Sequence, residues 1–130
     1  MTTPIFPPQQ AEQDEQSLRE DLAAAYRLLA LFDMTDLVYT HLSVRLPGPG
    51  HTFLVNPYGL LFEEITASSL VVVDADGLPK QPTSWPVNPA GFVLHSAVHP
   101  SRPDAACVMH THTLPGMTVA AQPHGILPLN

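Results

Sequence analysis

Two histidines separated by one residue, His110 and His112, are the part of the sequence best suited to metal chemistry. If the segment from Ala105 to His112 is extended, residues two apart share a face, and their Cα atoms lie about 6.5–7 Å apart. Two imidazole nitrogens at that separation can reach one zinc ion, at Zn–N distances of about 2.0–2.1 Å. Cys107 would face the other way. A pair of surface histidines at a strand end is the alternative, since catalytic zinc usually has about three protein ligands.

Other side chains could complete a site around this pair. His95 could point toward His110 from a neighbouring helix and is the best internal substitute for a third ligand, although a helix-face histidine with a structural role is the simpler interpretation. Glu63 and Glu64 could supply a carboxylate base, but an exposed pair in a turn is the more economical reading. The remaining histidines outside these segments are expected to be exposed and polar: His51, His99 and His124.

Composition narrows the class of protein that must position these residues. The chain has 130 residues, of which 45% are hydrophobic and only 13% charged, so it can form one domain with a real core. Five basic against twelve acidic residues, a net charge of -7, argue against nucleic acid as a partner. No apolar run approaches the roughly 20 residues that span a bilayer, and the N-terminus lacks signal-peptide features. The single cysteine suits a cytoplasmic location.

The expected elements alternate between helix and strand. Residues 1–16 are rich in proline and glutamine and indicate a flexible tail. Ser17 and Glu20 form a capping-box pattern that starts a helix ending near Phe32–Asp33, with an apolar stripe along it. Strands are expected at 36–46, 52–55, 70–73 and 105–112, with one helical turn at 66–69.

A second helix is expected from Pro89 to His99. Asn88 has the character of an N-cap, and proline fits the first helical position that follows it. Pro100 is expected to end this helix, which would place Phe92, His95 and His99 on one stripe. A last short helix should start at Thr113, before an irregular end over 122–130. This order predicts a layered α/β domain with a mixed sheet.

Several segments, in the right order, resemble the class II aldolase/adducin family, specifically its adducin-like branch. They are residues 37–45, 53–61, 66–70, 88–99 and 101–113, and the resemblance covers roughly 17–130. The resemblance implies a three-layer α/β/α class II aldolase-like domain, with a mixed, largely antiparallel central sheet. It also implies that 17–130 is an incomplete domain, lacking its C-terminal part, and that the protein assembles as a homo-oligomer, often a tetramer with sites between subunits.

The resemblance also implies specific roles for residues. His110 and His112 match the family's divalent-metal ligands, usually for zinc, while the third histidine ligand lies in the C-terminal half of the family's domain. Such a metal polarises a carbonyl or enediolate oxygen while a carbon–carbon bond breaks. His41 and Ser43 lie where the family contacts a phosphate, so they are candidate substrate-binding residues.

Two departures from the family pattern bear on activity. Gly91 stands at the position of the family's acid/base glutamate, and glycine cannot transfer a proton. Thr40 and His41 replace the Gly-Asn pair that contacts the phosphate. We therefore expect a zinc-dependent lyase-type activity on a small carbonyl or hydroxy-acid compound, with an unidentified catalytic acid/base. The alternatives are a non-catalytic adducin-like association module and an inactive partial domain.

Overall fold

The computed structural model describes residues 14–127, without the side chains of Pro89 and Ala90. Three α-helices, four short strands and one 3-10 helix follow one another along this part of the chain. In order, they are α1 (Glu15–Leu31), β1 (His41–Arg45), β2 (Phe53–Val55), η1 (Phe62–Glu64), β3 (Val71–Val73), α2 (Pro89–Ser101), β4 (Cys107–His110) and α3 (Leu114–Ala120).

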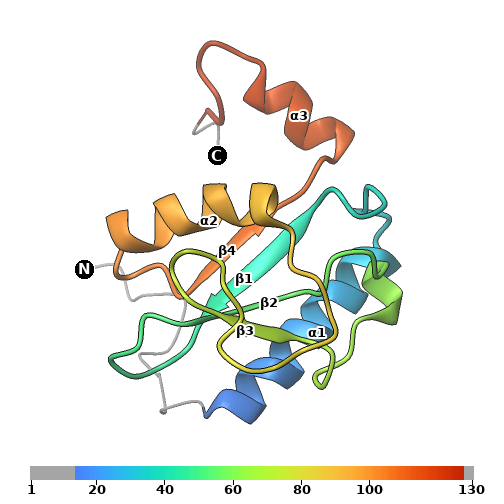
Figure 1. Ribbon diagram of the computed structural model, residues 1–130. Helices are drawn as coiled ribbons and strands as arrows, with labels where there is room; N and C mark the ends of the chain where they lie inside the picture. The colour runs from blue at the N-terminus through green and yellow to red at the C-terminus, as the bar shows by residue number, and fades with distance from the viewer. Residues whose placement is uncertain (1–13, 128–130) are drawn as a thin grey trace, which may run out of the picture.

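The strands form one sheet in the order β3-β2-β1-β4. Helix α1 covers one face and α2 covers the other, so the domain has the three α/β/α layers that the family resemblance implies (Figure 1). Each pairing among the described strands is antiparallel, so the parallel component of the expected mixed sheet is absent from residues 14–127. Helix α3 stands away from the sheet, beyond α2 (Figure 1).

Alternation along β1 decides which side chains face α2. Leu42 is buried in the core against α1, and Val44 packs on the same core. Because successive side chains in a strand point to opposite faces, His41 and Ser43 project toward α2 instead. The predicted strand at 36–46 is shorter in the structure, since Leu37 has a φ of 50°, a left-handed conformation that a strand cannot contain.

Helix α1 begins earlier than expected. Asp14, not Ser17, is the N-cap, and its carboxylate accepts a hydrogen bond of 2.8 Å from the backbone N–H of Ser17. Glu15 and Gln16 are therefore helical, whereas the rest of the predicted tail, 1–13, lies outside the described residues. The buried face of α1 consists of Leu22, Ala23, Tyr26 and Leu29. The helix ends at Leu31, one residue before the predicted end, and Phe32 is its exposed C-cap.

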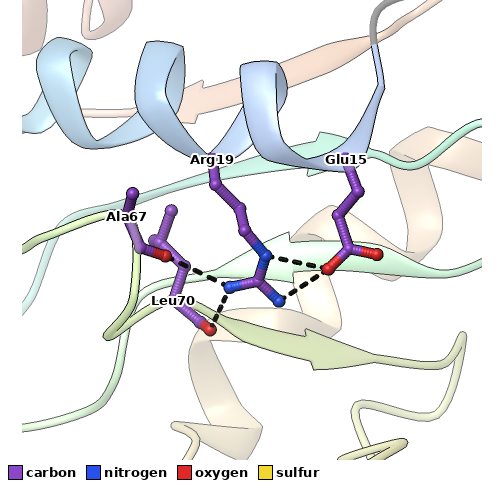
Figure 2. A network of polar contacts seen from close by, with 4 residues as sticks. All are labelled: Glu15, Arg19, Ala67 and Leu70. Atoms are coloured by element: carbon purple, nitrogen blue, oxygen red, sulfur yellow. Dashed lines mark hydrogen bonds and ion pairs between the residues drawn. The ribbon is translucent and has the colours of Figure 1, made fainter.

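An arginine joins α1 to the segment that leads into β3. The guanidinium of Arg19 forms an ion pair with Glu15 one helical turn away, and donates hydrogen bonds to the carbonyl oxygens of Ala67 and Leu70 (Figure 2). Residues 66–69 form a hydrogen-bonded turn and not the expected helical turn, because the Thr66 and Ser69 side chains bond to the local backbone. The single helical turn of this region is η1.

Helix α2 starts as predicted. The side chain of Asn88 caps it by accepting a hydrogen bond of 3.3 Å from the Gly91 backbone N–H. The helix ends at Ser101, two residues beyond the predicted end, because Pro100 lies inside its last turn and does not stop it. Helix α3 has Thr113 as its N-cap, also as predicted. Within residues 14–127, no helix has the length and apolar character that a membrane crossing requires.

Candidate metal centre

Antiparallel pairing of β1 with β4 brings the histidines of distant segments together. His41 and His110 are direct cross-strand partners in this ladder. Their rings meet edge to face at a centroid distance of 5.5 Å. His112 follows the end of β4, and its ring packs against that of His110 at 4.6 Å with an angle of 81° between the planes. The sheet register therefore creates an imidazole cluster at one end of β1.

The two rings of the His-x-His pair present nitrogens to each other. The Nε2 atoms of His110 and His112 are 3.1 Å apart. In tetrahedral zinc coordination, bonds of about 2.0–2.1 Å place two ligand nitrogens about 3.3 Å apart. The observed separation is close to that edge length, so a cation could take the place of the proton that the two nitrogens share.

Asp36 orients His112, a contact that sequence reasoning missed. The Nδ1–H of His112 donates to Oδ2 of Asp36 at 2.7 Å, across 76 positions of sequence. This assigns the lone pair of neutral His112 to Nε2, the atom that faces His110. A carboxylate on the far nitrogen is typical of metal-binding histidines. No local signal marked Asp36, because only the β1–β4 pairing brings the segment before β1 beside the segment after β4.

His110 carries a second, unused nitrogen. Its Nδ1 atom is buried and has no hydrogen-bond partner among residues 14–127. Burial lowers the pKa of His110, and the neighbouring His112 lowers it further. The ring is therefore held neutral, which is the form that binds metals.

His41 is fixed between α2 and the pair. Its Nε2–H donates to the backbone carbonyl of Gly91 at 2.7 Å, and its ring stacks on His95 with centroids 4.1 Å apart. Burial lowers the pKa of His41, and the hydrogen bond to the Gly91 carbonyl only partly opposes this effect. Nδ1 is consequently the nitrogen of His41 that carries the lone pair.

Ser43 links two buried histidines of α2. The Ser43 hydroxyl lies 2.6 Å from Nδ1 of His95 and 2.9 Å from Nε2 of His99. Since Nδ1–H of His99 donates to the Ala105 carbonyl at 3.2 Å, its Nε2 accepts the hydroxyl proton, and Ser43 accepts from Nδ1–H of His95. This order leaves Nε2 of His95 as a lone pair, buried and without a partner in the described chain.

Both buried histidines are held neutral. Burial lowers the pKa of His95 to about 3, with contributions from His41, His99 and His110. Burial also lowers the pKa of His99. The expectation that His99 is exposed is wrong: its exposed fraction is 0%, and its ring stacks on Phe53 at 4.5 Å. An aromatic platform and two hydrogen-bond partners make an interior position favourable for this polar ring.

Not every predicted site residue joins the cluster. Ser43 has 0% exposure and its hydroxyl bonds to two imidazoles, so its role in substrate binding stays a prediction. The backbone N–H of Leu61 donates to the Glu64 carboxylate, which therefore serves its own 3-10 helix and not the imidazole cluster. Within 14–127, no group of three or more histidine, cysteine or carboxylate residues is placed to hold a metal, so His95 as third ligand stays a prediction. His51 and His124 are exposed, as predicted.

A small, partly open pocket adjoins the cluster through His41. Its polar lining includes Asn56, Tyr58 and Asn88, and Gly91 also lines it. Apolar side chains make up the rest of the wall: Val38, Val55, Val87 and Phe92. The arrangement brings a potential metal-binding pair, an oriented imidazole and a small cavity to the same end of the sheet.

Comparisons with known proteins identify the family and the fold. Residues 20–130 match the family described as Class II Aldolase and Adducin N-terminal domain. An aldolase class 2-type protein of Caulobacter vibrioides is 55% identical over 88% of this chain and 45% of its own length. Alpha-adducin of Mus musculus is 46% identical over 92% of this chain and 16% of its own.

Solved structures give the same picture. An aldolase II superfamily protein of Pseudomonas syringae has a TM-score of 0.84 and 51% identity, over 95% of this chain and 49% of that one. An L-fuculose 1-phosphate aldolase of Glaciozyma antarctica has a TM-score of 0.80 and 36% identity, over 91% and 50%. The chain thus spans about half the length of these microbial relatives.

Proposed function

Because the chain belongs to the class II aldolase and adducin N-terminal domain family, we propose that it binds a divalent metal ion, zinc foremost, through His110 and His112. The observation that carries this proposal is the 3.1 Å separation of their Nε2 atoms. Imidazole nitrogen is a preferred zinc donor, and the carboxylate of Asp36 on the far side of His112 is a suitable outer partner.

The ligand set within this chain is incomplete. Two imidazoles give weak binding, since catalytic zinc sites use about three protein ligands. A third ligand would come from the remainder of a longer protein, because the relatives are about twice as long as the chain, or from His95 after a rearrangement. A cytoplasmic location, expected from the single cysteine, and assembly into a homo-oligomer, expected from the resemblance, are part of the same proposal.

The proposed reaction class is lyase-type chemistry on a small carbonyl or hydroxy-acid compound. A bound metal would supply Lewis-acid stabilisation of negative charge on a carbonyl or enediolate oxygen. His41 orients the substrate beside the metal pair, because its ring lines the pocket and contacts His110. Gly91 has no side chain to move a proton, so acid/base chemistry belongs to another group. The similarity to the Glaciozyma antarctica protein, which is named an aldolase, supports this choice.

Zinc binding by the full chain tests the metal proposal. We expect wild type to bind zinc in equilibrium dialysis and His110→Ala to lose it. His124→Ala, which removes an exposed histidine away from the cluster, is the matched control and should bind like wild type. Equal zinc binding by wild type and His110→Ala would contradict the proposal, as would the absence of binding in wild type.

A non-catalytic association module is the second candidate function. Gly91 at the acid/base position and the similarity to alpha-adducin favour it. Exposed apolar side chains on α2 and α3 suit an associating surface: Val93, Leu94, Leu114 and Met117. Light scattering combined with the zinc dialysis distinguishes the candidates, because a module would form a defined oligomer from wild-type protein that binds no zinc.

A further inference from the structure

The pocket beside His41 contains no positive charge from this chain. The sequence has five lysine and arginine residues, all of them among the described residues. None of the five lines the pocket, and each has a partner elsewhere. Three form ion pairs: Arg19 with Glu15, Lys80 with Asp74, and Arg102 with Asp104. Arg27 and Arg45 donate hydrogen bonds to the carbonyls of Ile65 and His99. A phosphoryl group entering the pocket would meet no cationic side chain of this chain.

The helix terminus at the pocket is also poorly suited to an anion. Helix N-termini bind phosphates through free backbone N–H groups. Here Pro89 at the first turn has no N–H, and the Gly91 N–H is already donated to the side chain of Asn88. The start of α2 therefore has fewer free backbone N–H groups with which to bind an anion.

Four polar side chains line the pocket: His41, Asn56, Tyr58 and Asn88. The Asn56 carboxamide already bonds to the Tyr26 hydroxyl and the Pro57 carbonyl, and Tyr58 is 42% exposed. The groups that His41 and Asn88 offer are complementary to a hydroxyl. His41 donates its Nε2–H to the Gly91 carbonyl, so its other nitrogen offers a lone pair, which accepts a proton and repels an anion. Asn88 uses its carboxamide oxygen as the helix cap, and its NH₂ group remains a donor. A hydroxyl can donate to the first group and accept from the second, whereas a phosphate dianion has no proton to donate.

Apolar side chains make up the lining beside these four polar residues and Gly91. Val38, Val55, Val87 and Phe92 surround the polar groups, and Val55 and Phe92 are buried core residues. Such a wall favours a short alkyl group through burial of apolar surface. Desolvating a charged group against it is costly unless that charge finds a partner.

We infer that this pocket receives an uncharged, hydroxyl-bearing group with a short alkyl part, and that it rejects phosphorylated compounds. The inference rests on the proposed function in one respect: it names the class of substrate for the same site. It does not require a metal, because the lining residues are distinct from His110 and His112. The two ideas can therefore fail separately.

Isobutanol and isobutyl phosphate are a matched pair of probes, since they differ only in the phosphoryl group. Binding is followed in the full chain, without added metal, through the ¹⁵N-resolved side-chain amide of Asn88. We expect isobutanol to shift this resonance in a saturable way and isobutyl phosphate to bind at least tenfold more weakly. Tighter or equal binding of the phosphate ester would overturn the inference, and so would the absence of a response to isobutanol.

Two variants sharpen the test. Tyr58 lines the pocket and is 42% exposed, so Tyr58→Lys places an ammonium group at its rim and should raise affinity for isobutyl phosphate at least tenfold. Tyr39→Lys makes the same change at a 60% exposed residue outside the lining and should leave that affinity unchanged. Equal gains in both variants would indicate non-specific attraction and contradict the inference.

Asn88→Asp tests the hydroxyl contact. Aspartate is as good an N-cap as asparagine, so the helix is retained while the NH₂ donor is lost. We expect isobutanol binding, followed here through the backbone amide of Gly91, to weaken at least fivefold. Comparing wild type with His110→Ala separates the two proposals, because alcohol binding should persist in the variant. Alcohol binding by a wild-type protein that binds no zinc refutes only the metal site, and phosphate binding by a wild-type protein that binds zinc refutes only the pocket assignment.

Discussion

The His41 ring occupies the space that a side chain at Gly91 would need. A Cβ atom built on Gly91 would lie 3.1 Å from Cε1 of His41 and 3.2 Å from Nδ2 of Asn88. His41 and Gly91 are also joined by the hydrogen bond from the His41 imidazole to the Gly91 carbonyl. Absence of a side chain at 91 and presence of a ring at 41 are therefore two aspects of one packing arrangement.

Gly91→Ala should destabilise the protein or displace His41. Alanine is favoured over glycine in a helix by about 1 kcal/mol, so a neutral or negative change in stability would itself show the clash. Chemical denaturation measures the change, and the double variant with His41→Ala should recover stability, with a coupling of roughly 0.5–3 kcal/mol. Gly50→Ala is the control, since its Cβ would find only ordinary contacts with Thr52. Additive effects of the two changes would exclude the arrangement described.

Asp36→Asn should weaken zinc binding without unfolding the protein. The carboxylate holds Nδ1–H of His112 and directs Nε2 toward the shared point, and loss of such partners typically costs 10–100-fold in metal affinity. Competition with a zinc chelator gives the affinity. Asp76→Asn changes an exposed carboxylate in the turn after β3 and should have no effect. An unchanged affinity in Asp36→Asn would mean that His112 is not a ligand.

Tyr26→Phe should lower the free energy of unfolding by about 1–3 kcal/mol. Tyr26 is fully buried, with 0% exposure. Its hydroxyl accepts a hydrogen bond from the Leu42 backbone N–H at 2.7 Å and lies 2.8 Å from the Leu42 carbonyl. Its removal leaves buried backbone groups of β1 unsatisfied, next to His41. Urea denaturation measures the loss, with Tyr39→Phe at an exposed residue as control. If Tyr26→Phe lowers the free energy of unfolding no more than Tyr39→Phe does, the Leu42 backbone groups do not depend on the Tyr26 hydroxyl.

The protein should lose stability as the pH falls from about 6.5 toward 3. Burial lowers the pKa of His95 to about 3 and also lowers that of His99, so both remain neutral in the folded chain while the unfolded chain binds protons near pH 6.5. The unfolded state therefore binds more protons in this window, and stability rises with pH by up to about 1.4 kcal/mol per pH unit for each histidine. Above the window this contribution is constant.

Equilibrium unfolding across pH measures that slope. His95→Gln removes one of the titrating groups and should flatten the profile, whatever its effect on absolute stability. His124→Gln removes an exposed histidine and should reproduce the wild-type slope. A wild-type profile that stays level between pH 6.5 and 4 would mean that these rings are not held neutral.

Periodicity predicted most of the fold because burial follows side-chain alternation. The strands at 53–55 and 71–73 and the start of α2 at Asn88 lie where turn residues and β-branched runs place them. The predicted start of the first helix was wrong by three residues. Asp14 and Ser17 are both suitable N-caps, and local propensity does not distinguish between them. Leu37 broke the predicted strand through a backbone conformation that its apolar side chain does not signal.

The site was less predictable than the fold, because its contacts join residues that are far apart in the sequence. The His-x-His pair is a local pattern, and the structure brings the two rings together. The contacts that orient the rings join residues far apart in sequence, such as Asp36 with His112 and Ser43 with His99. Side-chain type also misled: histidine and serine are counted as surface residues, but each member of this network supplies the partner that another needs in the interior.

The hydrogen-bonded series from the Ala105 carbonyl through His99 and Ser43 to His95 has a single direction. Its parts come from a loop, a helix and a strand, so no single segment carries it. Anyone grafting this cluster onto another scaffold would have to transplant all three pieces with their relative orientation. An isolated peptide copy of the His-x-His segment would lack the support that holds its neighbours in place.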